Sequence, residues 1–355
     1  MSSPLRVAVR ADAGPALGSG HVMRCLTLAA ALRQRGAQVH FVCRDGAGHL
    51  GGRIAADGHG LTLLGKTLTA EQDAHHSRAA LAEAWRGAGC DLLLVDHYQL
   101  DASWEQALRP ACRRLAAIDD LADRPHAVDL LLDQNLGRMV GDYAALLPAA
   151  AVRLIGPRYA LLRPEFAAAR TTSLARRGTG SWRHLLLSLG GADPHQGTLH
   201  CLQALAACPL PPDVQVTVVL GALASTRPSI QALLPTLPFA TRLLTDVADM
   251  APLLAEADLA IGAAGGSAWE RCCLGLPSLL LVLADNQRPG TQALDAAGAA
   301  LSLGGIDDLA ARLPAALQQL AQPGRLAALS AAASAITDGQ GAARVADALL
   351  ALHQG

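Results

Sequence analysis

Short apolar runs alternate with segments whose apolar positions recur at helical spacing along most of the chain. This alternation is typical of βαβ units that build a parallel sheet. The first series predicts strands over 5–9, 38–43, 61–64, 91–96, 115–118, 130–132 and 151–155. The second series predicts strands over 184–189, 214–220, 243–244, 259–261 and 278–283, followed by alanine- and leucine-rich helix from residue 306 onward.

The segment 156–182 interrupts this rhythm, because G-P-R-Y-A-L-L-R-P-E-F is followed there by a polar stretch. A domain boundary is expected at such a segment. We therefore predict an α/β fold of two doubly wound, Rossmann-like parallel-sheet domains that face one another across a cleft. The predicted domains span 1–168 and 182–335, and the helix within 336–355 is expected to pack back on the N-terminal domain.

The glycine-rich stretch Arg10–Arg24, R-A-D-A-G-P-A-L-G-S-G-H-V-M-R, joins the first predicted strand to the first helix. In an open parallel sheet, ligands bind at the carboxyl ends of the strands. His21 falls in the first helical turn, where the helix dipole disfavours a further cation and favours the neutral imidazole that a general base needs. The spacing fails the G-x-G-x-x-G pattern, so a dinucleotide site is not supported. From this loop alone, a tight turn with a solvent-facing histidine is the alternative.

Composition narrows the class of protein. The 355 residues carry a net charge of −1, which gives no reason to expect nucleic acid or an anionic membrane as a partner. Lys66 is the only lysine, so no glycine-rich loop is a Walker-type P-loop. The start of the chain lacks a signal-peptide pattern, and no apolar run reaches the ~18 residues of a membrane span. We therefore expect a cytoplasmic protein.

Cysteine and histidine spacing gives no sign of a metal site. The 8 cysteines form no C-x-x-C motif and the 12 histidines lack metal-ligand spacing. We expect reduced thiols in the core, no metal and no cofactor.

The predicted loops of the two halves differ in chemistry. In the second half they hold glycine turns at helix starts, Gly190-Gly191 and Gly265-Gly266-Ser267. The backbone N–H groups of such turns approach phosphate closely, so this half is expected to hold an anion. In the first half they hold titratable groups: Asp12, His21, Asp96, His97 and Tyr98. We interpret His97 and the Asp119-Asp120 pair as structural, or as supporting the residues that contact substrate, and not as catalytic.

Glu270 has two interpretations. With Ser267 it has the Ser-x-x-Glu spacing of a capping box, which would satisfy the start of a helix. Alternatively, its carboxylate accepts hydrogen bonds from both ribose hydroxyls of a nucleotide whose diphosphate rests on the preceding glycines.

Six motifs in order resemble the UDP-sugar hydrolase of pseudaminic acid biosynthesis, a family related to the MurG-like, GT-B-fold glycosyltransferases. They are R-A-D-x-x-x-x-L-G-S-G-H-V-M-R-C at 10–25, V-D-H-Y at 95–98, G-P-x-Y-A-L-L-R-P-E-F at 156–166, S-L-G-G-A-D-P at 188–194, G-A-A-G-G-S-A-W-E-R-C-C-L-G-L-P at 262–277 and A-D-N-Q at 284–287. The resemblance implies hydrolysis of UDP-2,4-diacetamido-2,4,6-trideoxy-β-L-altropyranose to UDP and the free sugar, with inversion and without a metal.

The resemblance also implies roles for single residues. It makes His21 the general base, directs Tyr98 and Asn286 at the sugar, and places Glu270 at the ribose. The full set expected to face the sugar is Asp12, Gly20, Tyr98, Asn286 and Gln287. The full set expected to bind UDP is Gly190, Gly191, Val247, Gly265, Gly266, Ser267 and Glu270. The expected partners are a UDP-sugar substrate and the UDP product, and we expect a monomer.

Two other functions fit the same motifs. A glycosyltransferase could use His21 to deprotonate an acceptor hydroxyl instead of water. A nucleotide-sugar-binding module without turnover would keep the glycine turns, but it would not require the titratable cluster of the first half. UDP release without any acceptor distinguishes the hydrolase from both.

Overall fold

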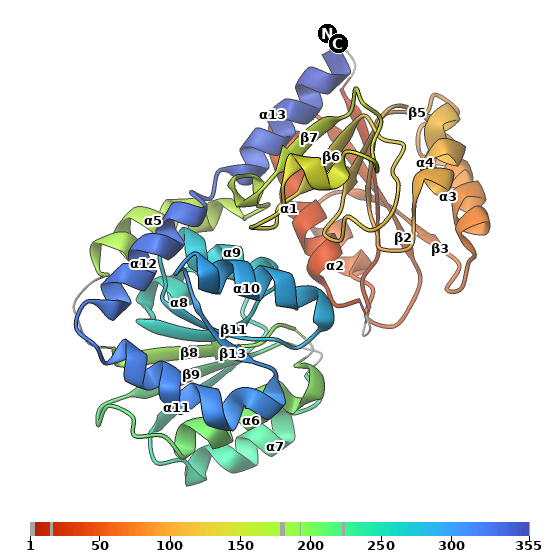
Figure 1. Ribbon diagram of the computed structural model, residues 1–355. Helices are drawn as coiled ribbons and strands as arrows, with labels where there is room; N and C mark the ends of the chain where they lie inside the picture. Colours follow the sequence, from red (N-terminus) through yellow and green to blue (C-terminus); the bar gives the residue numbers. More distant parts are fainter. Residues whose placement is uncertain (1–3, 15–16, 178–181, 192, 222–223, 355) are drawn as a thin grey trace. The chain divides into compact units, whose positions relative to one another are not determined.

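The computed structural model describes residues 4–14, 17–177, 182–191, 193–221 and 224–354 (Figure 1). The chain divides into two compact units: unit 1 is Met1–Leu161 with Gln340–Gly355, and unit 2 is Leu162–Gly339. The sequence placed the end of the N-terminal domain at residue 168 and the start of the C-terminal helix segment at 336. Residues 15–16 of the first glycine-rich loop, 178–181 of the boundary segment and 192 of the second-half turn lie outside the described residues.

Unit 1 is built on a seven-stranded parallel sheet with the strand order β3-β2-β1-β4-β5-β6-β7. Its strands are β1 (Arg6–Ala11), β2 (Gln38–Arg44), β3 (Gly60–Leu64), β4 (Cys90–Asp96), β5 (Cys112–Ile118), β6 (Leu130–Asp133) and β7 (Val152–Ile155). The chain winds outward first in one direction and then in the other from β1 and β4. In such a sheet the crevice at this switch point, outside the carboxyl ends of the strands, is where ligands bind.

Helices cover both faces of this sheet. They are α1 (Gly20–Gln34), α2 (Gly51–Ala56), α3 (Ala70–Ala84), α4 (Ala102–Leu108) and α13 (Gly341–Gln354). Side chains of α1, α2 and α13 share one core with one face of the sheet, and side chains of α3 and α4 share another core with the opposite face. The last helix therefore completes the first unit.

Unit 2 is built on a six-stranded parallel sheet with the order β10-β9-β8-β11-β12-β13. Its strands are β8 (His184–Ser188), β9 (Gln215–Leu220), β10 (Ala240–Thr245), β11 (Leu259–Ala263), β12 (Ser278–Leu281) and β13 (Leu301–Gly304). Here the switch point lies between β8 and β11. The sequence did not predict β13, whose residues L-S-L-G include a serine and a glycine and so lack the continuous apolar run of the other strands.

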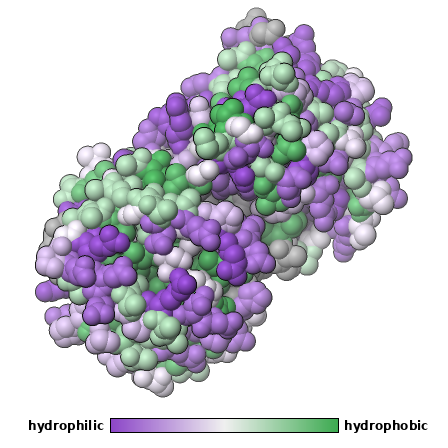
Figure 2. Space-filling view, viewed as in Figure 1, coloured by the Kyte–Doolittle hydropathy of each residue, from purple (hydrophilic) through white to green (hydrophobic). Residues whose placement is uncertain are grey.

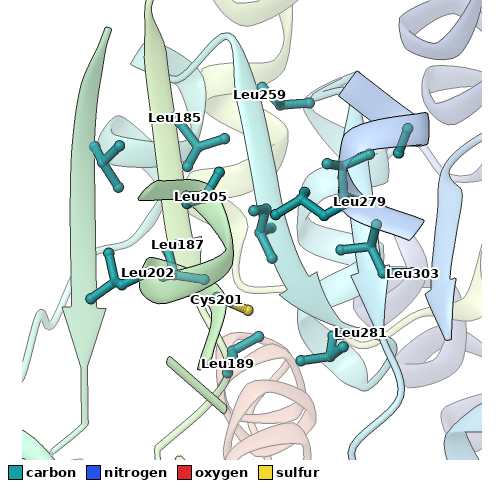
Figure 3. Close-up of a cluster of buried hydrophobic side chains, with 14 of the residues drawn as sticks. Leu185, Leu187, Leu189, Cys201, Leu202, Leu205, Leu259, Leu279, Leu281 and Leu303 are labelled. Carbon is teal, nitrogen blue, oxygen red and sulfur yellow. The ribbon is translucent and has the colours of Figure 1, made fainter. Parts of the chain in front are cut away.

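The helices of unit 2 are α5 (Pro164–Ala175), α6 (Gly197–Ala206), α7 (Arg227–Leu233), α8 (Ala251–Glu256), α9 (Gly266–Cys273), α10 (Arg288–Ala296), α11 (Leu309–Leu320) and α12 (Arg325–Ile336). Leucines of β8, β11, β12 and β13 share one buried core with side chains of α6 and α11 (Figure 3). Helix α12 exposes four alanines, Ala327, Ala328, Ala331 and Ala335. Figure 2 shows weakly hydrophobic colouring over the region of this helix.

Two further predictions concern composition. All eight cysteines are free thiols, six of them buried, as expected for reduced core residues. Among the helices of the described residues, none combines the length and the apolar character that a membrane crossing requires.

Candidate active site

The imidazole of His21 and the carboxylate of Asp96 meet at the switch point of unit 1. His21 lies in the first turn of α1, directly after the β1 loop, and Asp96 is the last residue of β4. Since β1 and β4 are neighbours in the sheet, their carboxyl ends bring the two side chains together. His21 Nδ1 lies 2.6 Å from Asp96 Oδ1, and both residues are buried.

Asp96 is held in its ionised form by Arg24. The guanidinium donates from Nε to Asp96 Oδ2 and from Nη2 to Asp96 Oδ1, both at 2.6 Å. Burial acts to raise the pKa of Asp96, but the charge of Arg24, with that of His21, holds this pKa well below its usual range. An ionised carboxylate only accepts hydrogen bonds, so His21 Nδ1 carries the hydrogen. In the neutral ring the lone pair is then on Nε2, for which the described residues provide no hydrogen-bond partner.

Tyr98 packs its ring edge-on against the same imidazole. The two ring centroids are 4.6 Å apart, and the Tyr98 hydroxyl is directed at Asp120 Oδ2, at 3.5 Å. Arg24 Nη1 donates to the same Asp120 oxygen at 2.7 Å. The structure therefore brings the predicted Tyr98 to the predicted His21 and joins them through Arg24 and Asp120.

Asp12 is occupied by protein partners. Its Oδ1 accepts from Arg10 Nη1 at 2.6 Å and from the Arg44 backbone N–H at 2.7 Å. Its Oδ2 accepts from Arg10 Nη2 at 2.8 Å and lies 3.2 Å from His97 Nε2. Arg10 also forms a two-point ion pair with Asp73 of α3. This buried network ties the ends of β1 and β2 to α3, which is a structural arrangement and agrees with the interpretation of His97.

Gly20 is exposed as the first residue of α1. Ser19 precedes it without a side-chain capping bond, and the first turn of α1 contains no acidic residue. The N–H groups at this end of the helix are thus not capped by a side chain, next to His21.

The glycine turn after β8 is open and firmly anchored. Gly190 has φ +96°, a conformation that favours glycine, and a Cβ built there would meet no other atom within 4 Å. A Cβ on Gly221, after β9, would instead overlap the backbone of Gly191. Buried Asp193 fixes the turn from behind, because it accepts from Thr198 N at 2.9 Å, Thr198 Oγ1 at 2.7 Å and Thr226 Oγ1 at 2.5 Å.

The start of α9 corrects one prediction. The N-cap is Gly265, and no side chain caps it. Ser267 and Glu270 are both inside the helix, so the predicted capping box does not form. The Ser267 hydroxyl accepts from Arg271 Nη1 at 3.2 Å instead. As at Gly190, a Cβ on Gly265 or Gly266 would meet no other atom within 4 Å, so there is open space beside the first residues of α9.

Because the capping box does not form, the ribose interpretation of Glu270 is the one that remains, as a prediction. It is partly buried, and burial raises the pKa of its carboxyl to about 7, although Arg163 and Arg271 lower it. Its carboxylate makes no ion pair with a described residue at short range, which leaves it available to hydroxyl donors.

The remaining predicted residues follow other strands of the same sheet. Asn286 is exposed in the turn Asp285–Gln287 after β12. Gln287 Oε1 accepts from the Leu283 N–H at 3.0 Å, so this side chain shapes its own loop. Val247 is partly exposed after β10.

Sequence reasoning gave no role to Arg24 and Asp193, and named Asp96 without assigning it one. A signal for Arg24 was present, since it follows His21 by three residues and such residues share a helix face. No local signal identified Asp96 as the partner of His21, because the two residues are 75 positions apart in the sequence.

No protein-family model matches the sequence. The chain is 26% identical over 302 residues to the spore coat polysaccharide biosynthesis protein SpsG of Bacillus subtilis, with 84% of each chain covered. It is 31% identical over 224 residues to the UDP-N-acetylglucosamine–N-acetylmuramyl-(pentapeptide) pyrophosphoryl-undecaprenol N-acetylglucosamine transferase of Xanthomonas campestris, covering 61% of this chain and 47% of the transferase. It is 27% identical over 163 residues to the UDP-2,4-diacetamido-2,4,6-trideoxy-β-L-altropyranose hydrolase of Campylobacter jejuni, covering 46% of this chain and 53% of the hydrolase. The matches to these two enzymes of UDP-linked sugars span about half of each enzyme.

Solved structures share the fold over nearly the whole chain. MurG of Acinetobacter baumannii superposes with a TM-score of 0.71 at 16% identity, covering 98% of this chain and 100% of MurG. UDP-GlcNAc 2-epimerase of Neisseria meningitidis bound to UDP-GlcNAc gives 0.63 at 12% identity, covering 98% and 100%. These likenesses confirm the predicted fold class, two doubly wound Rossmann-like domains as in the GT-B fold, and at such identities they establish the fold alone.

Proposed function

We propose that this chain hydrolyses a UDP-linked sugar to UDP and the free sugar, with His21 as the general base. The observation that carries the proposal is the His21–Asp96 pair at the switch point of unit 1. A carboxylate that fixes the tautomer of an imidazole leaves Nε2 ready to accept a proton, which is the arrangement of a general base.

In the proposed reaction, water attacks the anomeric carbon as Nε2 of His21 takes one of its protons. The bond between the anomeric carbon and the oxygen of the β-phosphate breaks, and its electron pair leaves with UDP. Attack from the side opposite to the leaving group inverts the anomeric centre. Arg24 offsets the charge of Asp96 in the resting enzyme, and Asp96 stabilises the imidazolium that forms when His21 accepts the proton.

Unit 2 is proposed to bind the UDP part. The glycine turn at Gly190 and the start of α9, which no side chain caps, suit the diphosphate, because helix N-termini and glycine turns favour anions. Glu270 is proposed to accept from the ribose hydroxyls, and Asn286 to contact the sugar. A leaving group stabilised in this way needs no strong general acid, so one base is sufficient.

The likeness to the Campylobacter enzyme supports a diacetamido-trideoxy sugar as the substrate, specifically UDP-2,4-diacetamido-2,4,6-trideoxy-β-L-altropyranose, in pseudaminic acid biosynthesis. The likeness to the Xanthomonas transferase supports the second candidate, an inverting glycosyltransferase in which an acceptor hydroxyl replaces water at His21.

Incubation with a panel of UDP-sugars in ¹⁸O-labelled water, without acceptor, tests the proposal. We expect UDP release with no ¹⁸O in the UDP, since the sugar–oxygen bond breaks. His21→Asn should lower kcat by about 10²–10⁴-fold, the usual contribution of a general base, while UDP still binds. The matched control is His59→Asn, a buried histidine beside the start of β3, which should keep normal turnover.

Each other outcome contradicts the proposal in a different way. Release that requires an added acceptor supports the transferase. Label in the UDP indicates attack at phosphorus. Normal turnover by His21→Asn would show that His21 is not the general base.

A further inference from the structure

Arg271 is a buried cation without an anionic partner. It is 3% exposed, and no carboxylate of a described residue lies within ion-pair distance of its guanidinium. Nη1 donates to Ser267 Oγ at 3.2 Å and Nη2 to the carbonyl oxygen of Ala263 at 2.6 Å, while Nε has no partner. Glu270 acts on it only at longer range, and the raised pKa of Glu270 makes it a weak counter-charge at neutral pH.

Arg271 belongs to the last turn of α9, but its guanidinium lies beside the first turn, where the helix dipole is unfavourable to a cation. Side chains on a helix lean toward its N-terminus, and Arg271 accordingly reaches back to Ser267 in the first turn. The N-terminus carries the positive end of the dipole and favours anions. Two other arginines of unit 2 follow the usual rule: Arg170 donates to the carbonyl oxygen of Ser334 in the last turn of α12, and Arg177 to that of Leu254 in the last turn of α8.

The backbone makes room for the guanidinium. A Cβ on Gly262, in β11, would lie 2.5 Å from Arg271 Nη1 and 2.7 Å from its Cζ, so any other residue there would displace the guanidinium. The guanidinium therefore lies against the end of β11 and bonds to both ends of the loop from Ala263 to Ser267. This is the loop in which a Cβ on Gly265 or Gly266 would meet no other atom within 4 Å.

We propose that Arg271 is the buried counter-charge of the nucleotide's diphosphate, acting as a positioning residue from inside the loop. The inference rests on the proposed function, because it takes the start of α9 as the diphosphate site. A buried charge without a partner is costly to the protein. The unpaired charge of Arg271 destabilises the protein without ligand. A diphosphate bound at the same loop would offset this unfavourable free energy. Arg271 thus distinguishes a nucleoside diphosphate from the nucleoside alone.

The test compares UDP with uridine, measured by calorimetry at about pH 8.5, where Glu270 is ionised. Arg271→Met removes the charge, Arg271→Lys keeps it, and Arg170→Met is the control at a helix C-terminus. We expect Arg271→Met to weaken UDP binding by about 10- to 100-fold, as for loss of a charged hydrogen-bonding group. Uridine binding should change much less, and Arg271→Lys should fall between wild type and Arg271→Met for UDP.

Thermal unfolding gives a second readout that a purely structural role would not produce. Without ligand, Arg271→Met should melt at or above the temperature of the wild type, because an unpaired buried charge is gone. Its melting temperature should rise less when UDP is added. Arg170→Met should instead melt lower without ligand and keep the wild-type ratio of UDP to uridine affinity.

An equal loss of UDP and uridine affinity in Arg271→Met, no loss of either, or a failure of this variant to fold would each overturn the inference. Failure of the proposed function is recognised separately. The wild type could bind UDP with the expected dependence on Arg271 but hydrolyse no UDP-sugar. That result would support the role of Arg271 as a counter-charge and contradict the proposed hydrolase activity. If the wild type binds neither UDP nor inorganic pyrophosphate, both are wrong.

Discussion

At the residue scale, the chemistry of this protein depends on side chains whose charge is set by their neighbours. Arg24 keeps Asp96 ionised, and Asp96 fixes the proton on His21 Nδ1. In unit 2 the opposite holds for Glu270, since burial raises the pKa of its carboxyl to about 7. The first carboxylate is insensitive to pH near neutrality, whereas the second titrates there.

Uridine affinity should therefore depend on pH through Glu270. Ribose hydroxyls donate best to the ionised carboxylate, so binding should strengthen as the pH rises through 7. Affinity at about pH 8 should be roughly tenfold that at about pH 6, and it should level off above. Calorimetry with uridine avoids titration of the phosphates of UDP.

Two variants check that Glu270 is the group responsible. Glu270→Gln should flatten the profile. Glu165→Gln should keep the rise but move it to lower pH, because the charge of Glu165 contributes to the raised pKa of Glu270. A profile that stays unchanged in Glu270→Gln would mean that another group titrates.

At the scale of single elements, the glycine turn after β8 is held in place by a neighbouring loop. Asp193 anchors the turn to α6 and to Thr226, and the backbone of Gly191 is in close contact with Gly221. The turn is thus fixed by the contacts of Asp193 and Gly191, while the space beside Gly190 stays open.

Gly221→Ala should disturb the turn without touching a ligand. The new Cβ overlaps the Gly191 backbone, so something must move, at a cost of about 1–3 kcal/mol in the free energy of unfolding. UDP affinity should fall together with stability. Urea unfolding and UDP calorimetry measure the two effects.

Gly52→Ala in α2 is the control, because a Cβ there meets no atom within 4 Å. It should raise stability by about 0.5–1 kcal/mol, as expected for alanine in a helix, with UDP affinity unchanged. Normal UDP binding by a destabilised Gly221→Ala would separate the turn from the nucleotide site.

At the scale of the whole molecule, the two units differ in the number of chain segments that form them. Unit 2 is one continuous segment with a core of its own. Unit 1 needs the end of the chain, because Val345 and Leu349 of α13 are fully buried in the core shared with α1.

A segment covering 162–339 should accordingly fold by itself and bind UDP. A chain that ends at residue 339 should keep this UDP binding but lose turnover, since the α1 face that carries His21 would be uncovered. Circular dichroism, cooperative unfolding and UDP calorimetry test both shortened chains. Loss of UDP binding in a folded 162–339 segment would contradict the assignment of UDP to unit 2.

Local patterns determined most of the architecture. The strand–helix alternation depends only on the spacing of apolar residues, so it predicted two parallel-sheet series and the glycine loops at their carboxyl ends. It also placed His21 in a first helical turn, because a glycine-rich loop before a helical period identifies the start of α1.

The tertiary structure decided what these residues contact. Strand order alone sets which loops are neighbours, and it brought Asp96 to His21 and enclosed Asp12 among Arg10, Arg44 and His97. The Ser267–Glu270 spacing suited a capping box, but the loop leaving β11 starts the helix two residues earlier, with Gly265 as the N-cap, and the Ser267 hydroxyl accepts from Arg271 instead. Spacing along a chain records local geometry, whereas the partner of a buried charge is fixed by residues far away in sequence that only folding brings near.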